Sequence, residues 1–136
     1  MKKRSFLRVI LCAAFTVLLT VFSLACTPRN DASIVGTWQL ISYTTDDGLS
    51  ASGEDFDVQL LMIFRENGMG EAKADDQLQY VFSYTARRGE LRREITRTTT
   101  DVQQVLESYT IDGGGKCLTV YSPEEQATIV LQRVTE

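Results

Sequence analysis

The sequence contains no histidine and only three cysteines among its 136 residues. Without histidine, the chain lacks the side chain that most often acts as a general acid or base near neutral pH and most often binds transition metals. Cys12 and Cys26 lie near the start, which leaves Cys117 alone in residues 27–136. An internal disulfide is therefore excluded from that part of the chain, and its stability has to come from packing.

No group of residues suited to catalysis stands out either. Cys117 and the serines have no histidine base, and the pairs of carboxylates fall in apparent turns, where solvent keeps their chemistry ordinary. Glu54, Asp55 and Asp57 lack the twelve-residue spacing and the terminal glutamate of a calcium-binding loop. We therefore expect a protein that is not an enzyme and that uses no metal or cofactor.

Charge and hydropathy separate the first 25 residues from the rest. Lys2, Lys3, Arg4 and Arg8 open the chain, and residues 9–25 contain no charge. This pattern is typical of an export signal, so residues 1–25 are expected to be a helical signal peptide. Removing its four cations leaves 10 of the 14 basic residues against all 18 acidic ones. Because phosphate binding needs a basic surface, no nucleic-acid partner is expected.

The signal peptide ends in Phe22-Ser23-Leu24-Ala25-Cys26, which resembles the lipobox of bacterial lipoproteins. The resemblance implies a lipid on Cys26, which would anchor the protein to a membrane of the bacterial cell envelope. Thr27, rather than aspartate, follows the cysteine; in enterobacteria-like sorting this favours the outer membrane. Cleavage by ordinary signal peptidase near Ala25 and an uncleaved single-span anchor are the alternatives.

Residues 26–33 are polar and contain a proline, which favours a short tether between the lipid and the domain. Residues 34–136 then show short apolar runs separated by turn residues, and no long helical periodicity. This pattern predicts eight strands, at residues 36–44, 57–65, 69–75, 78–87, 90–99, 102–111, 116–122 and 126–134. Their even spacing and short turns predict an all-β, antiparallel up-and-down barrel of eight strands.

Two segments of this pattern leave more than one interpretation. Residues 50–57 show no strand pattern and are rich in serine, glycine and acidic residues, so they are either a lid over the barrel or a mobile connection. Residues 60–64 are apolar on both faces of their strand. The outer face is then expected to be covered by the tether or by a neighbouring molecule.

Gly36-Thr37-Trp38 opens the first predicted strand and resembles the Gly-x-Trp signature of lipocalin-like barrels. Arg133 lies on the last strand in phase with Ile129 and Leu131, as does the final-strand arginine that packs on this tryptophan in lipocalins. The resemblance implies that Gly36, Trp38 and Arg133 close the barrel. A guanidinium over an indole contributes about 0.5 to 2 kcal/mol.

Two further stretches extend this likeness to small lipocalin-like domains of bacterial lipoproteins. They are residues 62–70, with a phenylalanine strand and an Asn-Gly turn, and residues 109–120, with a later hairpin. The resemblance covers most of residues 34–134 and implies a small apolar or amphipathic ligand inside the barrel. The residues expected to line such a site are Leu40, Phe64, Tyr80, Phe82, Tyr84, Arg93 and Tyr109.

Each of these expectations has an alternative. The aromatic side chains stabilise a small domain equally well as a packed core, because apolar burial contributes about 25 cal/mol per Å². Arg93 and Arg97 share a strand face with Leu91 and Ile95. If that face points inward, the buried guanidiniums require an anion, such as a fatty-acid carboxylate. If it points outward, the arginines are solvated or pair with acids on neighbouring strands.

Two functions of different kinds follow. The first is a membrane-anchored domain that binds a small hydrophobic or anionic amphipathic molecule in its barrel. The second is a cell-envelope interaction or inhibitor module whose barrel is filled by its own side chains and whose outer surface docks a protein. A retained ligand distinguishes the first function from the second.

Overall fold

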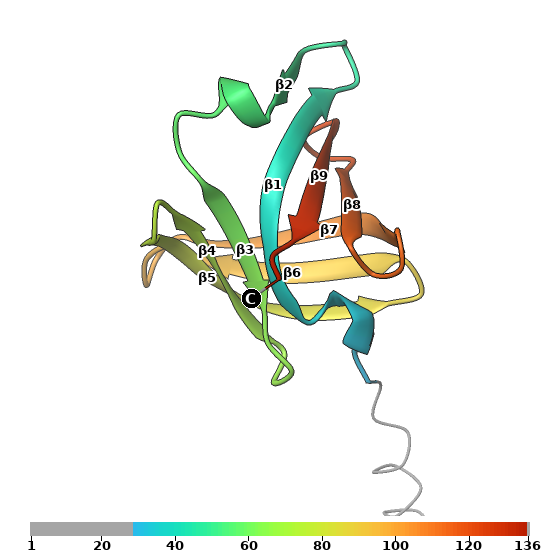
Figure 1. The fold of residues 1–136 in the computed structure, drawn as a ribbon. Helices are drawn as coiled ribbons and strands as arrows, with labels where there is room; N and C mark the ends of the chain where they lie inside the picture. Colours follow the sequence, from blue (N-terminus) through green and yellow to red (C-terminus); the bar gives the residue numbers. More distant parts are fainter. Residues whose placement is uncertain (1–28, 136) are drawn as a thin grey trace, which may run out of the picture.

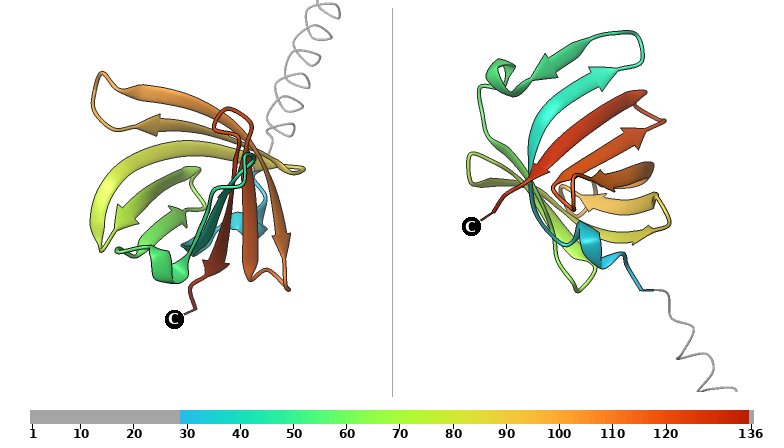
Figure 2. Two further views of the ribbon diagram at one scale, coloured as in Figure 1. Left: turned by 90° about the horizontal axis from the view of Figure 1, so that it is seen from above. Right: turned by 45° about the vertical axis from the view of Figure 1, so that its right-hand side comes forward.

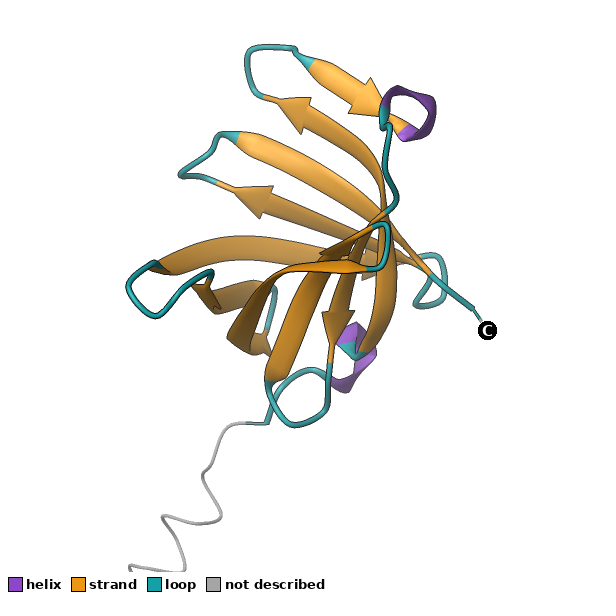
Figure 3. Cartoon of the chain, turned by 90° about the vertical axis from the view of Figure 1, so that its left-hand side faces the viewer, coloured by secondary structure: helices purple, strands orange, loops and turns teal. Residues whose placement is uncertain are grey.

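The computed structural model describes residues 29–135, and this part of the chain is almost entirely β-structure. Its strands are β1 (Gly36–Thr45), β2 (Ser50–Ser52), β3 (Leu60–Phe64), β4 (Met69–Ala74), β5 (Gln77–Arg87), β6 (Glu90–Thr96), β7 (Val102–Asp112), β8 (Cys117–Ser122) and β9 (Ala127–Arg133). Two single-turn 3-10 helices, η1 (Ala32–Ile34) and η2 (Gly53–Asp55), are the only helical elements in these residues (Figure 3).

Eight of these strands form a closed antiparallel barrel (Figures 1 and 2). The order is β1-β3-β4-β5-β6-β7-β8-β9, and β9 pairs back onto β1 from Trp38↔Arg133 to Thr45↔Ala127. Each strand therefore lies beside its neighbours in sequence, and closure removes the free edges that would invite aggregation. The predicted all-β, up-and-down eight-stranded barrel is confirmed.

Residues 50–57 differ from the prediction, because they contain a ninth strand. β2 pairs with the second half of β1 through Ser42↔Ser52, and η2 follows it directly. By contrast, the pairing of β3 with β1 is limited to Gly36–Gln39, at the start of β1. The sequence pattern missed β2 because three serine and alanine residues show too little alternation in hydrophobicity to be recognised.

The two ends of the barrel differ, and we name them by the ends of β1. At the closed end, where β1 begins, residues 30–35 run across the barrel and η1 lies against it (Figure 1). The Asp31 amide donates to Ala86 O at 2.7 Å, and the Ala86 amide donates to Asn30 Oδ1 at 3.0 Å. Residues 30–33, assigned to the tether, are thus part of the folded barrel.

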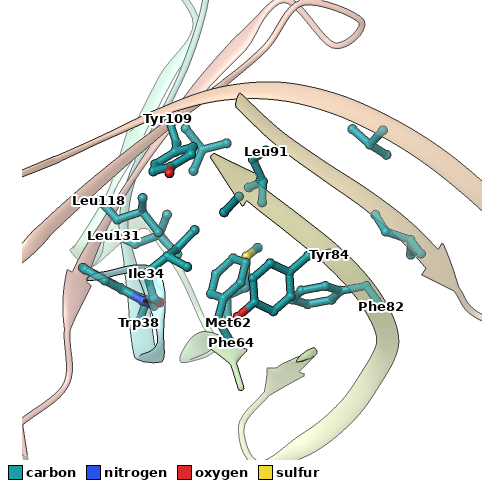
Figure 4. Close-up of a cluster of buried hydrophobic side chains, with 14 residues drawn as sticks. Ile34, Trp38, Met62, Phe64, Phe82, Tyr84, Leu91, Tyr109, Leu118 and Leu131 are labelled. Atoms are coloured by element: carbon teal, nitrogen blue, oxygen red, sulfur yellow. Dashed lines mark hydrogen bonds between the residues drawn. The ribbon is translucent and has the colours of Figure 1, made fainter. Parts of the chain in front are cut away.

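The core is made by strand alternation and lies in the closed half of the barrel. Every second residue is buried in β6, in residues 82–86 of β5 and in residues 105–109 of β7, which places Phe82, Tyr84 and Leu91 inside. Ile34 and Trp38, both with no exposed surface, lie beside Leu118 and Leu131 in this cluster (Figure 4). Ile34 belongs to residues 30–35, which we call the closing segment. Its burial in the core holds that segment in place.

The outward residues of β3 are partly covered. Leu61 and Ile63 are half-buried, whereas Met62 and Phe64 point into the barrel and are buried. The outer face of this strand is therefore shielded only in part by the rest of the described chain.

The helices within residues 29–135 are single turns, and neither of them could span a bilayer.

Candidate ligand site at the open end of the barrel

Two adjoining cavities occupy the open half of the barrel, where β1 ends and β9 begins. One has a volume of about 260 Å³ and is apolar, and the other has a volume of about 140 Å³ and is polar. Met62, Tyr80 and Ile129 line both cavities, so the two share a wall. Together they form a site with an apolar and a polar side, which is the arrangement that small-molecule sites generally show.

The apolar cavity lies where β1 and β3 separate. β3 pairs with β1 no further than Gln39, so Leu40 and Leu60 are left facing a space beyond the last shared pair. Its walls are Leu40, Leu60, Leu61, Met62, Ala72, Lys73, Gln79, Tyr80, Ile129 and Leu131. The early end of the β1–β3 pairing therefore creates the space that the core does not fill.

The polar cavity is built around a buried ion pair between neighbouring strands. Arg93 of β6 donates to Glu107 of β7 through Nε to Oε2 at 2.8 Å and through Nη2 to Oε1 at 2.7 Å. The residues are 7% and 6% exposed. Arg93 also lies over the Phe82 ring, with Cζ 5.3 Å from the ring centroid. Parallel hydrogen bonds of this kind fix both side chains in orientation as well as in position.

Burial and pairing act on the Arg93 charge in opposite directions. Desolvation lowers the pKa of the guanidinium, but the hydrogen bonds and the negative charge of Glu107 raise it further, so the pKa lies above its ordinary value. Arg93 is therefore charged at every physiological pH. Its charge is balanced within the protein.

Arg97 sits at the rim of the same cavity and is exposed. Its Nη1 donates to Gln103 Oε1 at 3.2 Å, and its Cζ lies 5.3 Å from the Tyr80 ring centroid. Glu125, also exposed, lines the same cavity from the turn between β8 and β9. The charged residues of the polar cavity are thus two cations, Arg93 and Arg97, and two anions, Glu107 and Glu125.

The predicted lining residues separate into two groups. Leu40, Tyr80 and Arg93 line the cavities. Four others lie in the packed core and line neither cavity: Phe64, Phe82, Tyr84 and Tyr109, which are at most 5% exposed. Phe64 packs edge-on against Phe82 and Tyr84, with ring centroids 5.3 and 5.0 Å apart. For these aromatic residues the core interpretation holds.

Arginine placement also differs from what the sequence suggested. The strand face with Leu91 and Ile95 does point inward, but it buries Arg93 alone, because Arg97 lies beyond the end of β6. The anion that Arg93 requires is Glu107, which the sequence analysis did not single out. Glu107 alternates in phase with the buried Val105 and Tyr109, and that phase is the signal that could have identified it.

Gly36, Trp38 and Arg133 meet at the closed end. Arg133 Cζ lies 4.2 Å from the Trp38 ring centroid, and the indole Nε1 donates to Ile34 O at 2.8 Å. Arg133 donates to Val35 O at 2.7 Å, to Ser33 O at 2.6 Å and to Gly115 O at 2.7 Å. One guanidinium therefore joins the closing segment, the first strand and the hairpin before β8.

Gly36 is required where it stands. Its φ of +139° is a conformation that side chains disfavour, and a Cβ there would collide with the Arg133 guanidinium. Cys26, the residue expected to carry lipid, and residues 1–25, the predicted signal peptide, lie outside the described residues. None of residues 50–57 lines either cavity, so the lid interpretation gains no support from the geometry of the site.

Comparison with known proteins places the chain in no group. No family model, no curated protein and no solved structure matches it.

Proposed function

We propose that the protein binds a small apolar or amphipathic molecule in the open end of its barrel and has no catalytic role. The observation that carries the proposal is the apolar cavity of about 260 Å³ that opens beside a polar one. Apolar surface left uncovered inside a barrel is unfavourable in water, so a ligand that displaces water from it gains free energy.

The cavity volumes limit the size of the ligand. Sites for drug-sized molecules span about 300 to 1,000 Å³, and the apolar cavity lies just below that range. The packed core closes the barrel below it, since Phe64 and Phe82 are each 1% exposed. The ligand is therefore a short-chain or single-ring molecule, or a larger one that inserts only one end.

We propose a lipocalin-like relationship on three grounds. They are the eight-stranded barrel, the sequence Gly36-Thr37-Trp38, and the position of Arg133 over the indole. We propose in addition that lipid on Cys26 anchors the protein in a bacterial cell envelope. The support for the anchor is the lipobox-like sequence alone. The outer membrane is the membrane that Thr27 favours under enterobacteria-like sorting.

An anchor at Cys26 would also orient the barrel. Asn30 is hydrogen-bonded to the closed end, and four residues span at most about 14 Å when extended. The closed end would then lie next to the membrane, and the open end would face away from it. A ligand would reach the site from the aqueous side or from a second protein.

Native mass spectrometry of the natively purified protein tests the binding proposal. The expected result is a mass excess that disappears on denaturation and that belongs to a small organic molecule. A matched variant, Leu60→Arg, places a charge in the apolar cavity without touching the closed-end core and should abolish the excess. An apo mass in the wild type, with no small apolar molecule binding on titration, would support the interaction-module alternative instead.

Membrane fractionation tests the anchor. Cys26→Ser should move the protein from the membrane to the soluble fraction, whereas Cys117→Ser, the matched control, should leave it in the membrane. If Cys26→Ser partitions like the wild type, the lipid assignment is wrong. The binding proposal does not depend on this outcome.

A further inference from the structure

The buried ion pair selects among ligands by the charge of their polar end. We propose that the site prefers an amphipathic ligand whose head is uncharged and carries an oxygen acceptor, such as an alcohol or a primary amide, over carboxylates and amines. This inference rests on the proposed function and names the ligand class of the same site.

Arg93 has no unbalanced charge to offer a ligand. Its Nε and Nη2 are both engaged by the Glu107 carboxylate, at 2.8 and 2.7 Å. A carboxylate that enters the polar cavity meets Glu107 as well as Arg93, and an ammonium group meets Arg93 as well as Glu107. Neither charge gains a partner that compensates for its loss of water.

One guanidinium nitrogen of Arg93, Nη1, is not engaged by Glu107. Arg93 Nη1 donates to the Met62 sulfur at 3.9 Å, the Tyr80 hydroxyl lies near the same guanidinium, and both residues line both cavities. A thioether is a poor acceptor, so an alcohol or carbonyl oxygen next to Nη1 would make a stronger hydrogen bond without adding charge. This weakly engaged donor therefore favours a neutral oxygen at the boundary between the two cavities.

The charges that line the polar cavity also balance as a set. Two cations and two anions line the polar cavity, so its formal charge is zero, and Lys73, the one charged residue that lines the apolar cavity, is paired with Glu71 at 3.3 Å. Arg97 could attract an anion at the rim, but Glu125 lies on the same rim, and both are exposed to solvent that screens them. The rim therefore does not reverse the preference set by the buried pair.

A panel of four ligands with one chain tests the inference. Octanol, octanamide, octanoate and octylamine are titrated into the wild-type protein by calorimetry, and the same heads on a hexyl chain control for length. Octanol and octanamide are expected to bind at least tenfold more tightly than the two charged ligands. Equal or tighter binding of octanoate or octylamine overturns the inference and leaves the proposed function standing. If no ligand of either length binds, the proposed function fails and the inference fails with it.

A charge variant tests the role of the pair directly. Glu107→Gln leaves the Arg93 charge unbalanced, so the affinity for octanoate relative to octanol should rise at least tenfold. Glu125→Gln removes an equal charge from the rim and should change this ratio less than threefold. If Glu107→Gln folds, as judged by circular dichroism, and keeps the wild-type ratio, the pair does not select the head. If it does not fold, the wild-type panel still decides.

Discussion

The two ends of this barrel are built from the same strands but differ in what fills them. At the closed end, Ile34 and Trp38 have no exposed surface, because residues 30–35 run across the barrel there. At the open end, Leu40 and Ile129 are only partly buried and face cavities. Closure by strand pairing therefore does not by itself fill a barrel. An added segment completes the core at one end, and the other end is left as a site.

Truncation of a large side chain at each end should break this comparison most visibly. Trp38→Ala removes a fully buried indole and should lower the free energy of unfolding by about 4 kcal/mol. Leu40→Ala, on the same strand and inward face, should cost about 1 kcal/mol, because that side chain already borders a cavity. Urea denaturation measures both. Equal losses would mean that the open end is packed like the closed end.

The ion pair at the boundary of the two halves gives the next largest effect. Glu107→Leu should cost about 3 kcal/mol, because it leaves the Arg93 charge buried without a partner. The double variant Arg93→Met, Glu107→Leu removes both charges and should return to within about 1 kcal/mol of the wild type. Thermal unfolding of the two variants compares them. A double variant as unstable as the single one would show that the pair is needed for packing rather than for charge balance.

Arg133 tests how the closing segment is attached. Arg133→Lys keeps the charge but loses the fork that reaches Ser33, Val35 and Gly115, and it should cost about 2 kcal/mol. Amide hydrogen exchange should rise in residues 31–35 and change little around the open-end turn at residues 97–101. The matched variant Arg92→Lys alters an exposed pair with Glu90 and should change stability by less than about 0.5 kcal/mol.

The smallest effect is a pH dependence that separates two tyrosines. Tyr109, at the closed end, donates to Asp31, and Tyr121, at the open end, donates to Asp46. Burial, together with the hydrogen bond to Asp31, raises the pKa of Tyr109 from 10.0 to about 12. Because the unfolded state loses this proton first, stability due to Tyr109 is complete below pH 10 and falls as pH rises toward 12.

Tyr109→Phe should therefore flatten the decline in unfolding free energy between pH 10 and pH 12. The pKa of Tyr121 is also raised, by its hydrogen bond to Asp46, but solvent surrounds that pair. Tyr121→Phe should change the slope less. Urea unfolding at several alkaline pH values measures the difference. Equal slopes in the two variants would mean that the two ends shield their tyrosines alike.

Much of the fold could be predicted from the sequence, because strands and hairpin turns depend on local patterns. The eight predicted strands lie where the barrel strands are, although the strand expected at residues 57–65 begins only at Leu60 and the one expected at 90–99 ends at Thr96. Alternation placed Phe82 and Tyr84 on the inward face. β2 escaped prediction, since its three small residues carry no such pattern.

The closing segment shows a second limit of local patterns. Residues 30–33 are polar and were predicted to be a tether, yet Asn30 and Asp31 satisfy backbone and side-chain groups at the closed end. Polar residues are equally common in tethers and in hydrogen-bonded caps, so composition does not separate the two. Only the position of their partners, more than 50 residues further along the chain, distinguishes them.

The sequence by itself determined the strand order, which residues of a strand share a face, and the absence of histidine chemistry, because each follows from composition or from spacing along the chain. Only the tertiary structure decided which inward residues fill the core and which border a cavity. That division depends on where β1 stops pairing with β3 and on which carboxylate lies opposite Arg93. Both are consequences of register between strands, which local sequence patterns do not specify.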